Sequence, residues 1–227
     1  MPDTRQSPPG AAAIVSSAPS RVGRSSPALR SLHRASAMVL ALFITAHVLG
    51  HLAGVASAAA HQAVLEALRG IYRQPVVEGV LLACVVFQGG SGLTLLWRGW
   101  RQRRGAVAWL QAASGAYLAL FLLIHVTAVL VARQNGVDTN LQFAAAGLRT
   151  PPQHWFFGPY YFLAVLALCT HAGCALYWNL PYRCRATVLA GAMVLGTLLA
   201  ATLVAMLAGG LEGVALLPAA TPETGPA

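Results

Sequence analysis

The sequence predicts an all-α integral membrane protein, a bundle of five transmembrane helices, and three observations support this fold class. The 227-residue chain is 57% hydrophobic and only 9% charged, whereas an average soluble domain is roughly a quarter charged. Its apolar residues are gathered in long blocks, each close to the about 20 residues that a helix needs to cross the hydrocarbon. The sequence also lacks the alternating segments of about ten residues that are typical of membrane β-strands.

Each apolar block is expected to be helical, because backbone groups in lipid must be hydrogen-bonded within the protein. The predicted spans run near Ser36–Ala58, Val76–Trp97, Ala108–Ala132, Trp155–Leu180 and Ala186–Leu207. Residues 1–30 are rich in Pro, Ser, Ala, Gly and Arg, and we predict a disordered cytoplasmic tail there. Residues 31–210 then form the membrane domain, and residues 211–227 form a flexible C-terminal tail.

The arginines predict the orientation of the bundle. The net charge is +9, and all 15 basic residues are arginine. Eleven precede the first span or follow the second or fourth, namely Arg5, Arg21, Arg24, Arg30, Arg34, Arg98, Arg101, Arg103, Arg104, Arg183 and Arg185. Positive residues favour the cytoplasmic side, so the N-terminus is expected in the cytoplasm and the C-terminus outside. This placement at helix ends accounts for the charge, and no nucleic-acid partner is predicted.

An internal repeat relates the first and third spans. Residues 32–48 and 110–126, laid over each other without gaps, share a leucine, an alanine, a serine, the run Leu-Ala-Leu-Phe and a final His-Val. The repeat makes His47 and His125 equivalent. A weaker echo relates residues 88–93 to residues 171–176, which makes Gln88 equivalent to His171.

The expected topology sets the depth of these polar residues. At about 1.5 Å per helical residue, His47 and His125 both reach the outer half of the bilayer. The second and fourth spans run in the opposite direction, so Gln88 and His171 share a level in the inner half. Ionisable residues inside a membrane usually face the bundle interior. The sequence therefore predicts an outer polar layer of two histidines and an inner layer of Gln88 and His171.

Two histidines at one depth on different helices suit bis-histidine haem ligation, in which each neutral imidazole supplies one axial nitrogen. Small residues near the candidate ligands would let a flat macrocycle pack closely, among them Ala46, Gly50, Gly89, Gly90, Gly92 and Gly173. A purely structural role, with each imidazole hydrogen-bonded to a carbonyl, is the alternative. His51 lies one turn beyond the predicted ligand and is a second candidate ligand or a partner for a haem propionate. His33 is expected to line a quinone or propionate site.

The remaining histidines, His61 and His154, are assigned no role. Glutamine offers iron only an amide oxygen, a weaker donor than imidazole. We therefore expect the amide of Gln88 to hydrogen-bond His171, and we expect one haem b per chain, with two as the alternative.

These pieces resemble the cytochrome b membrane anchor of succinate dehydrogenases and fumarate reductases, in its single-subunit, five-helix, di-haem form. The resemblance covers about residues 30–208. It is carried by residues 32–34 with His47, residues 109–125 with their Trp-Leu-Gln, Ser-Gly and His125, residues 155–178 with His171, and the Arg-Gln-Pro of residues 73–75.

The resemblance implies that His47 and His125 hold the outer haem and that His171 is half of an inner site. Gln88 stands where the family places the other inner ligand. It further implies a multi-pass protein of the bacterial inner membrane that is not catalytic alone. Such an anchor docks flavoprotein and iron–sulfur subunits on its cytoplasmic face and exchanges electrons with membrane quinone. A haem-poor anchor or interaction protein with structural histidines is the alternative, and a small proton transporter is a third hypothesis.

Overall fold

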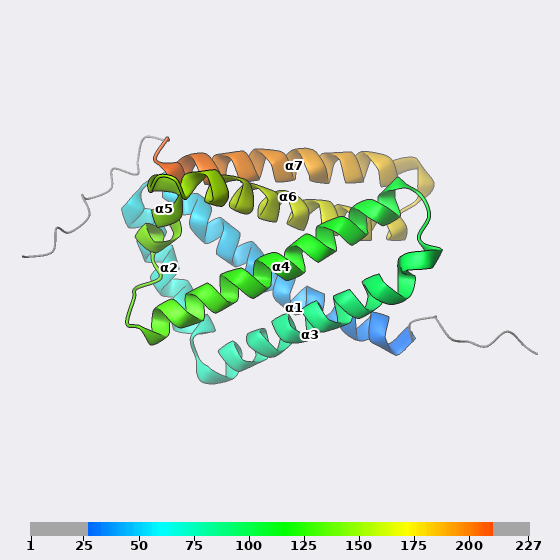
Figure 1. Ribbon diagram of the computed structural model, residues 1–227, viewed down its shortest axis with the longest axis horizontal. Coiled ribbons are helices and arrows are strands. Elements are labelled where there is room, and N and C mark those ends of the chain that lie inside the picture. The colour runs from blue at the N-terminus through cyan, green and yellow to red at the C-terminus, as the bar shows by residue number, and fades with distance from the viewer. Residues whose placement is uncertain (1–26, 211–227) are drawn as a thin grey trace, which may run out of the picture.

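The computed structural model describes residues 27–210, and within that range every regular element is helical. Five of the helices are long and apolar enough to cross a membrane, which confirms the predicted fold class (Figure 1). The predicted tail beyond residue 210, and residues 1–26 of the predicted N-terminal tail, lie outside the described residues. Residues 27–30, which the composition assigns to that tail, instead form the first turn of a helix.

The five long helices match the predicted spans closely. They are α1 (Pro27–Leu52), α3 (Pro75–Gly99), α4 (Ala106–Gln134), α6 (His154–Asn179) and α7 (Tyr182–Ala208). The largest difference is at the start of α1, which extends into a polar segment that hydropathy does not mark. Proline opens both α1 and α3, as expected because the first helical position needs no amide hydrogen.

Two shorter helices, α2 (Ala58–Tyr72) and α5 (Leu141–Arg149), were not predicted from the sequence. Short 3-10 turns, η1 (Ala53–Val55) and η2 (Trp100–Gln102), follow α1 and α3. The side chain of Ser57 caps α2 by accepting from the amide of Ala60. Asn140 caps α5 by accepting from two backbone amides. Such caps satisfy the first amides of a helix, which have no partner within it.

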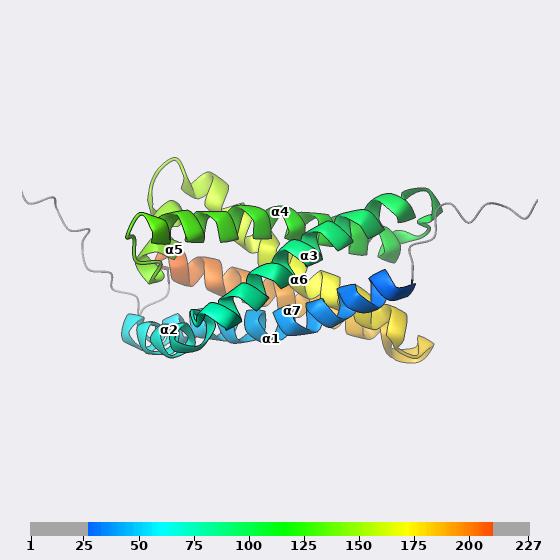
Figure 2. The same cartoon turned by 90° about the horizontal axis from the view of Figure 1, so that it is seen from below.

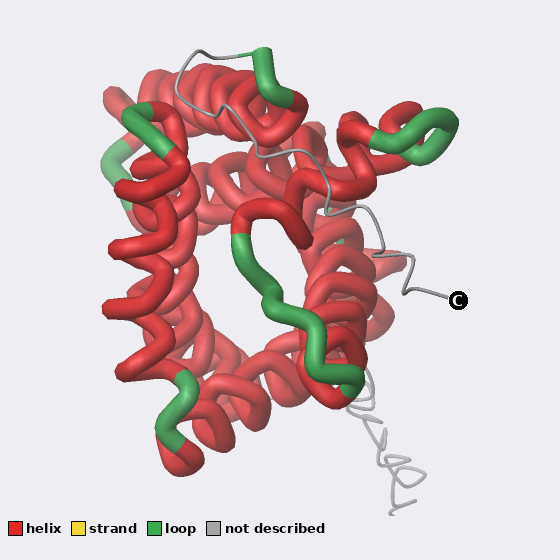
Figure 3. Tube along the Cα trace, turned by 90° about the vertical axis from the view of Figure 1, so that its left-hand side faces the viewer, coloured by secondary structure: helices red, strands yellow, loops and turns green. Residues whose placement is uncertain are grey.

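The long helices run alternately in opposite directions, so the start of α1 and the end of α7 lie at opposite ends of the bundle (Figure 1). One end carries the start of α1, the end of α3 and the α6–α7 turn, and with them most of the described arginines. We call it the arginine-rich end. The opposite end carries α2 and α5, as the view along the bundle from that side shows (Figure 3).

Neighbouring helices contact each other in the order α1, α3, α4, α6 and α7. From below, α3 runs obliquely between α1 and α4 (Figure 2). The tightest contact in the bundle is between α6 and α7. A Cβ added to Gly173 would lie 2.7 Å from the Cβ of Ala192. A Cβ added to Gly196 would lie 2.7 Å from the Cβ of Cys169. Small residues allow such close approach in membranes.

Gly173 therefore serves helix packing and does not face a macrocycle, contrary to the expectation from the sequence. A hydrophobic core lies at the α5 end of the bundle, around Leu141, Ala145, Leu148, Leu203, Met206 and Leu207. On the side of α6 that faces away from α7, the helices are less closely packed and enclose a cavity.

Candidate functional site

A large cavity of about 1930 Å³ runs through the middle of the bundle between α1, α3, α4 and α6. Typical small-molecule sites measure about 300–1,000 Å³, so this cavity is large enough for a bulky cofactor. Its walls are mainly apolar, and all six predicted site residues line it: His33, His47, His51, Gln88, His125 and His171. Arg30, Arg34, Arg98 and Arg103 line it at the arginine-rich end.

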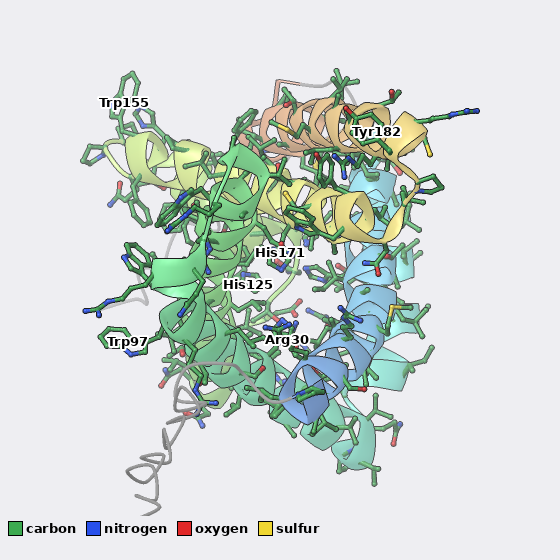
Figure 4. The ribbon with its side chains drawn as sticks, turned by 90° about the vertical axis from the view of Figure 1, so that its right-hand side faces the viewer. Arg30, Trp97, His125, Trp155, His171 and Tyr182 are labelled. Carbon is green, nitrogen blue, oxygen red and sulfur yellow. The ribbon has the colours of Figure 1, made fainter. Side chains whose placement is uncertain are left out.

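Viewed from the arginine-rich end, His125 and His171 point into the space that the helices enclose (Figure 4). Trp97, Trp155 and Tyr182 lie on the outside, as expected for residues at the ends of membrane helices. The polar groups therefore gather in the interior while the outer surface of the bundle is left to lipid.

The outer layer brings together the two histidines that the repeat made equivalent. The ring centroids of His47 on α1 and His125 on α4 lie 6.1 Å apart, with 66° between the ring planes. The two residues are 78 positions apart in the chain (125 − 47). The structure therefore places these two histidines side by side.

Each of these histidines stacks on the phenylalanine one turn before it. The ring centroids of Phe43 and His47 are 5.7 Å apart at 22°, and those of Phe121 and His125 are 5.2 Å apart at 11°. Both phenylalanines belong to the repeated Leu-Ala-Leu-Phe run. The repeat therefore builds the same half-site twice, and each phenylalanine restricts the rotation of its imidazole.

The spacing of the outer pair fits axial ligation of one haem iron. An imidazole nitrogen binds a metal at about 2.0–2.1 Å and lies about 1.1 Å from its ring centre, so two imidazoles across one iron have centroids about 6.3 Å apart. The 6.1 Å between His47 and His125 is close to that value. Among residues 27–210, no group of three or more His, Cys, Asp or Glu side chains is placed to hold a metal ion alone. A porphyrin would supply the four nitrogens that two imidazoles leave missing.

His51 extends the outer layer toward α2. Its ring lies 4.7 Å from that of His47, edge to face. Its Nδ1 atom lies 3.2 Å from Nε2 of His61 on α2. His61 is only 2% exposed, so the structure places a residue without an assigned role directly behind the outer pair.

The sequence did contain a signal for His61. In α2 the spacing of His61, Val64, Leu65 and Leu68 follows the three- and four-residue intervals of one helix face. A histidine on that apolar face must turn inward when the face packs against the bundle. The segment is too short and polar to cross a membrane, so the search for membrane spans did not mark it as a helix.

In the inner layer, Gln88 is held by residues of α1. Its Oε1 accepts from the hydroxyl of Ser36 at 2.6 Å, and its Nε2 lies 3.3 Å from Nε2 of His33. The other nitrogen of His33, Nδ1, lies 2.8 Å from the hydroxyl of Ser91 on α3. Gln88 thus hydrogen-bonds His33 instead of His171, which corrects the expected partner, because α1 is the direct neighbour of α3 and α6 lies across the cavity.

His171 is held in the same way by α4. Its Nδ1 lies 3.1 Å from the carbonyl oxygen of Gln111 and 3.3 Å from the hydroxyl of Ser114. Ser114 and Ser36 are the serines that the repeat shares. In the first half of the bundle, Ser36 and His33 therefore orient Gln88. In the second half, Ser114 and the backbone carbonyl of Gln111 orient His171.

One glycine lets an inner histidine approach the facing helix. A Cβ on Gly115 would lie 2.8 Å from Cε1 of His171, so His171 packs directly on the backbone of α4. A Cβ on Gly92 would lie 3.5 Å from Cε1 of His33, an ordinary contact that does not require glycine. Gly92 lines the cavity, whereas Gly115 was not singled out from the sequence for a role in packing.

No family model, curated protein or solved structure matches the chain. Functional inference therefore rests on the paired histidines, the cavity and the hydrogen-bond networks described above.

Proposed function

We propose that this chain is a membrane-anchor cytochrome b that binds b-type haem between His47 and His125. In this role it relays electrons between membrane quinone and a flavoprotein and iron–sulfur module, like that of succinate dehydrogenase or fumarate reductase, on the cytoplasmic face of a bacterial inner membrane. The observation that carries the proposal is the 6.1 Å spacing of the two imidazoles inside a large apolar cavity.

The side chains of the protein would bind the haem and set the polarity of its surroundings. His47 and His125 would each supply one imidazole nitrogen to hold the haem, and Phe43 and Phe121 stack on the two rings. When bound, haem carries one electron, and axial ligands and burial tune its potential. The mainly apolar cavity walls would favour the less charged form of the bound group.

Partner docking is proposed at the arginine-rich end. Eight described arginines lie there, namely Arg30, Arg34, Arg98, Arg101, Arg103, Arg104, Arg183 and Arg185. Clustered positive charge attracts an acidic partner surface and speeds association at low salt. The same end is expected in the cytoplasm because of the arginine bias, and a reporter fused to the C-terminus should accordingly report the outside.

Absorption spectroscopy tests the haem proposal. The purified wild-type protein should show the Soret and α bands of low-spin haem, and His47→Ala or His125→Ala should each abolish them. His154→Ala, at the start of α6, is the control and should keep the wild-type spectrum. A wild-type protein without haem would leave a haem-poor anchor with structural histidines. Wild-type spectra in both cavity variants would make the pairing wrong and His51 the next ligand to test.

A further inference from the structure

We propose that the inner layer, formed by His33, Ser36, Gln88 and His171, binds the ring of a quinone or quinol and is not a second haem site. The inference rests on the proposed function, because it assumes that the chain exchanges electrons with quinone. It is carried by the directions of the hydrogen bonds, which fix the groups that face the cavity.

The protonation of His33 follows from its partner. The hydroxyl of Ser91 donates to the carbonyl oxygen of Phe87 at 2.6 Å, so its oxygen must accept from Nδ1 of His33. A neutral imidazole has one N–H, so Nε2 of His33 carries a lone pair. The amide of Gln88 donates to that lone pair.

The orientation of Gln88 agrees with this assignment. Its oxygen accepts from Ser36, which leaves its nitrogen toward His33. An amide nitrogen carries two hydrogens, and only one is used by His33. The second N–H of Gln88 is therefore a donor for a group in the cavity that the residue lines.

His171 contributes an acceptor to the same cavity. A carbonyl oxygen can only accept, so the contact with Gln111 requires a proton on Nδ1 of His171. Its Nε2 therefore carries a lone pair. The inner layer thus combines one available N–H donor, from Gln88, with one available nitrogen acceptor, from His171.

This combination does not suit a second bis-histidine haem. Axial ligation needs two imidazole lone pairs facing one iron, and the lone pair of His33 is already covered by the amide of Gln88. A hydroquinone fits better, since one hydroxyl can donate to His171 while the other oxygen accepts from Gln88. A quinone ring is also planar and apolar, like the walls of the cavity, and its isoprenoid tail is soluble in the surrounding lipid.

The position is favourable for electron transfer. The inner layer lies nearer the arginine-rich end than the outer layer does, since His33 is in the second turn of α1 and His47 is 14 residues further along (47 − 33). A quinone there would lie closer to a partner docked at that end than the outer pair does.

The test uses the full-length protein in detergent and decylubiquinone as the probe. Binding is followed by quenching of tryptophan fluorescence, and haem is measured in parallel by pyridine haemochrome. Gln88→Leu and His171→Phe should each raise the Kd of the probe about fivefold or more with unchanged haem per chain. Ser36→Ala removes only the hydroxyl that orients Gln88, so it should raise the Kd about two- to threefold without disturbing the fold. Gln142→Leu, an exposed amide on α5, is the matched control and should leave the Kd unchanged.

The outcomes separate the two proposals. Unchanged Kd values in Gln88→Leu, His171→Phe and Ser36→Ala would overturn the inner quinone site whatever the haem content. A fall in haem from two per chain to one in His171→Phe would also overturn it, because His171 would then be a haem ligand. A wild-type chain that binds the probe but contains no haem would sink the proposed cytochrome while leaving the inner quinone site supported.

Discussion

Nε2 of His61 lies 3.2 Å from Nδ1 of His51, and this contact joins a helix outside the five spans to the imidazole one turn beyond His47. The other nitrogen of His61, Nδ1, is buried without a hydrogen-bond partner. Burial and the nearby Arg69 lower the pKa of His61 below its ordinary 6.5. The folded protein therefore favours the neutral ring.

Replacing His61 should change how stability depends on pH. A histidine with a lowered pKa binds fewer protons in the folded state than in the unfolded state, so stability falls as pH drops below about 6.5. We expect the Tm of His61→Phe to fall less between pH 7 and pH 5 than the wild-type Tm. Thermal denaturation followed by circular dichroism measures both curves. Parallel curves would mean that His61 is not held neutral in the folded protein.

Gly115→Ala should disturb His171. The added methyl would lie 2.8 Å from Cε1 of the imidazole, a distance that forces the ring or α4 to move. We expect a Tm below wild type and weaker binding of decylubiquinone. Gly90→Ala is the matched control, because nothing lies within 4 Å of its new methyl and alanine is the better helix former by about 1 kcal/mol. Equal behaviour of the two variants would show that His171 does not pack on the backbone of α4.

Hydropathy and the repeat predicted a good deal of this arrangement. Spans of about 20 apolar residues locate membrane helices, and the ends of α3, α4, α6 and α7 fall within a few residues of the predicted ones. The match between residues 32–48 and 110–126 predicted the meeting of His47 and His125. Depth along a helix follows directly from residue number, so the sequence could predict both the helix ends and the shared level of His47 and His125.

The sequence did not reveal how each helix is rotated about its axis or which helices lie next to each other. Gln88 and His171 share a level, but the partner of Gln88 depends on which helix adjoins α3, and that helix is α1. His61 was missed for a related reason. Its helix lies across the end of the bundle, where the depth argument gives no position, and only the apolar face of α2 indicated its burial.

An ion pair between Glu78 on α3 and Arg133 on α4 should stabilise the bundle near α2. Their side chains are 24% and 28% exposed, and the two terminal nitrogens of the guanidinium, Nη1 and Nη2, donate to the carboxylate. Glu78→Gln leaves the arginine without its counter-charge, and we expect a loss of about 1–2 kcal/mol, less than for a fully buried pair. The double variant Glu78→Gln/Arg133→Met should recover part of that loss. Chemical denaturation of the four proteins forms a double-mutant cycle, and additive losses would show that the pair is not coupled.

The last prediction concerns haem stoichiometry and Gln88→His. The wild-type protein should contain one haem per chain, because the inner layer offers His171 an amide as its counterpart and the lone pair of His33 is covered by that amide. Position 88 is equivalent to position 171 in the repeat, and both residues line the same cavity. A histidine at position 88 would therefore supply the missing nitrogen opposite His171. We expect Gln88→His to bind a second haem, doubling the haem per mole of protein, and to lose decylubiquinone binding because the macrocycle would occupy the inner layer.

His171→Phe in the same background should return the haem content to one. Two haems in the wild-type protein would contradict the prediction at once. One haem in Gln88→His, with quinone binding intact, would mean that the inner layer is too narrow for a macrocycle and is shaped for the smaller quinone ring alone.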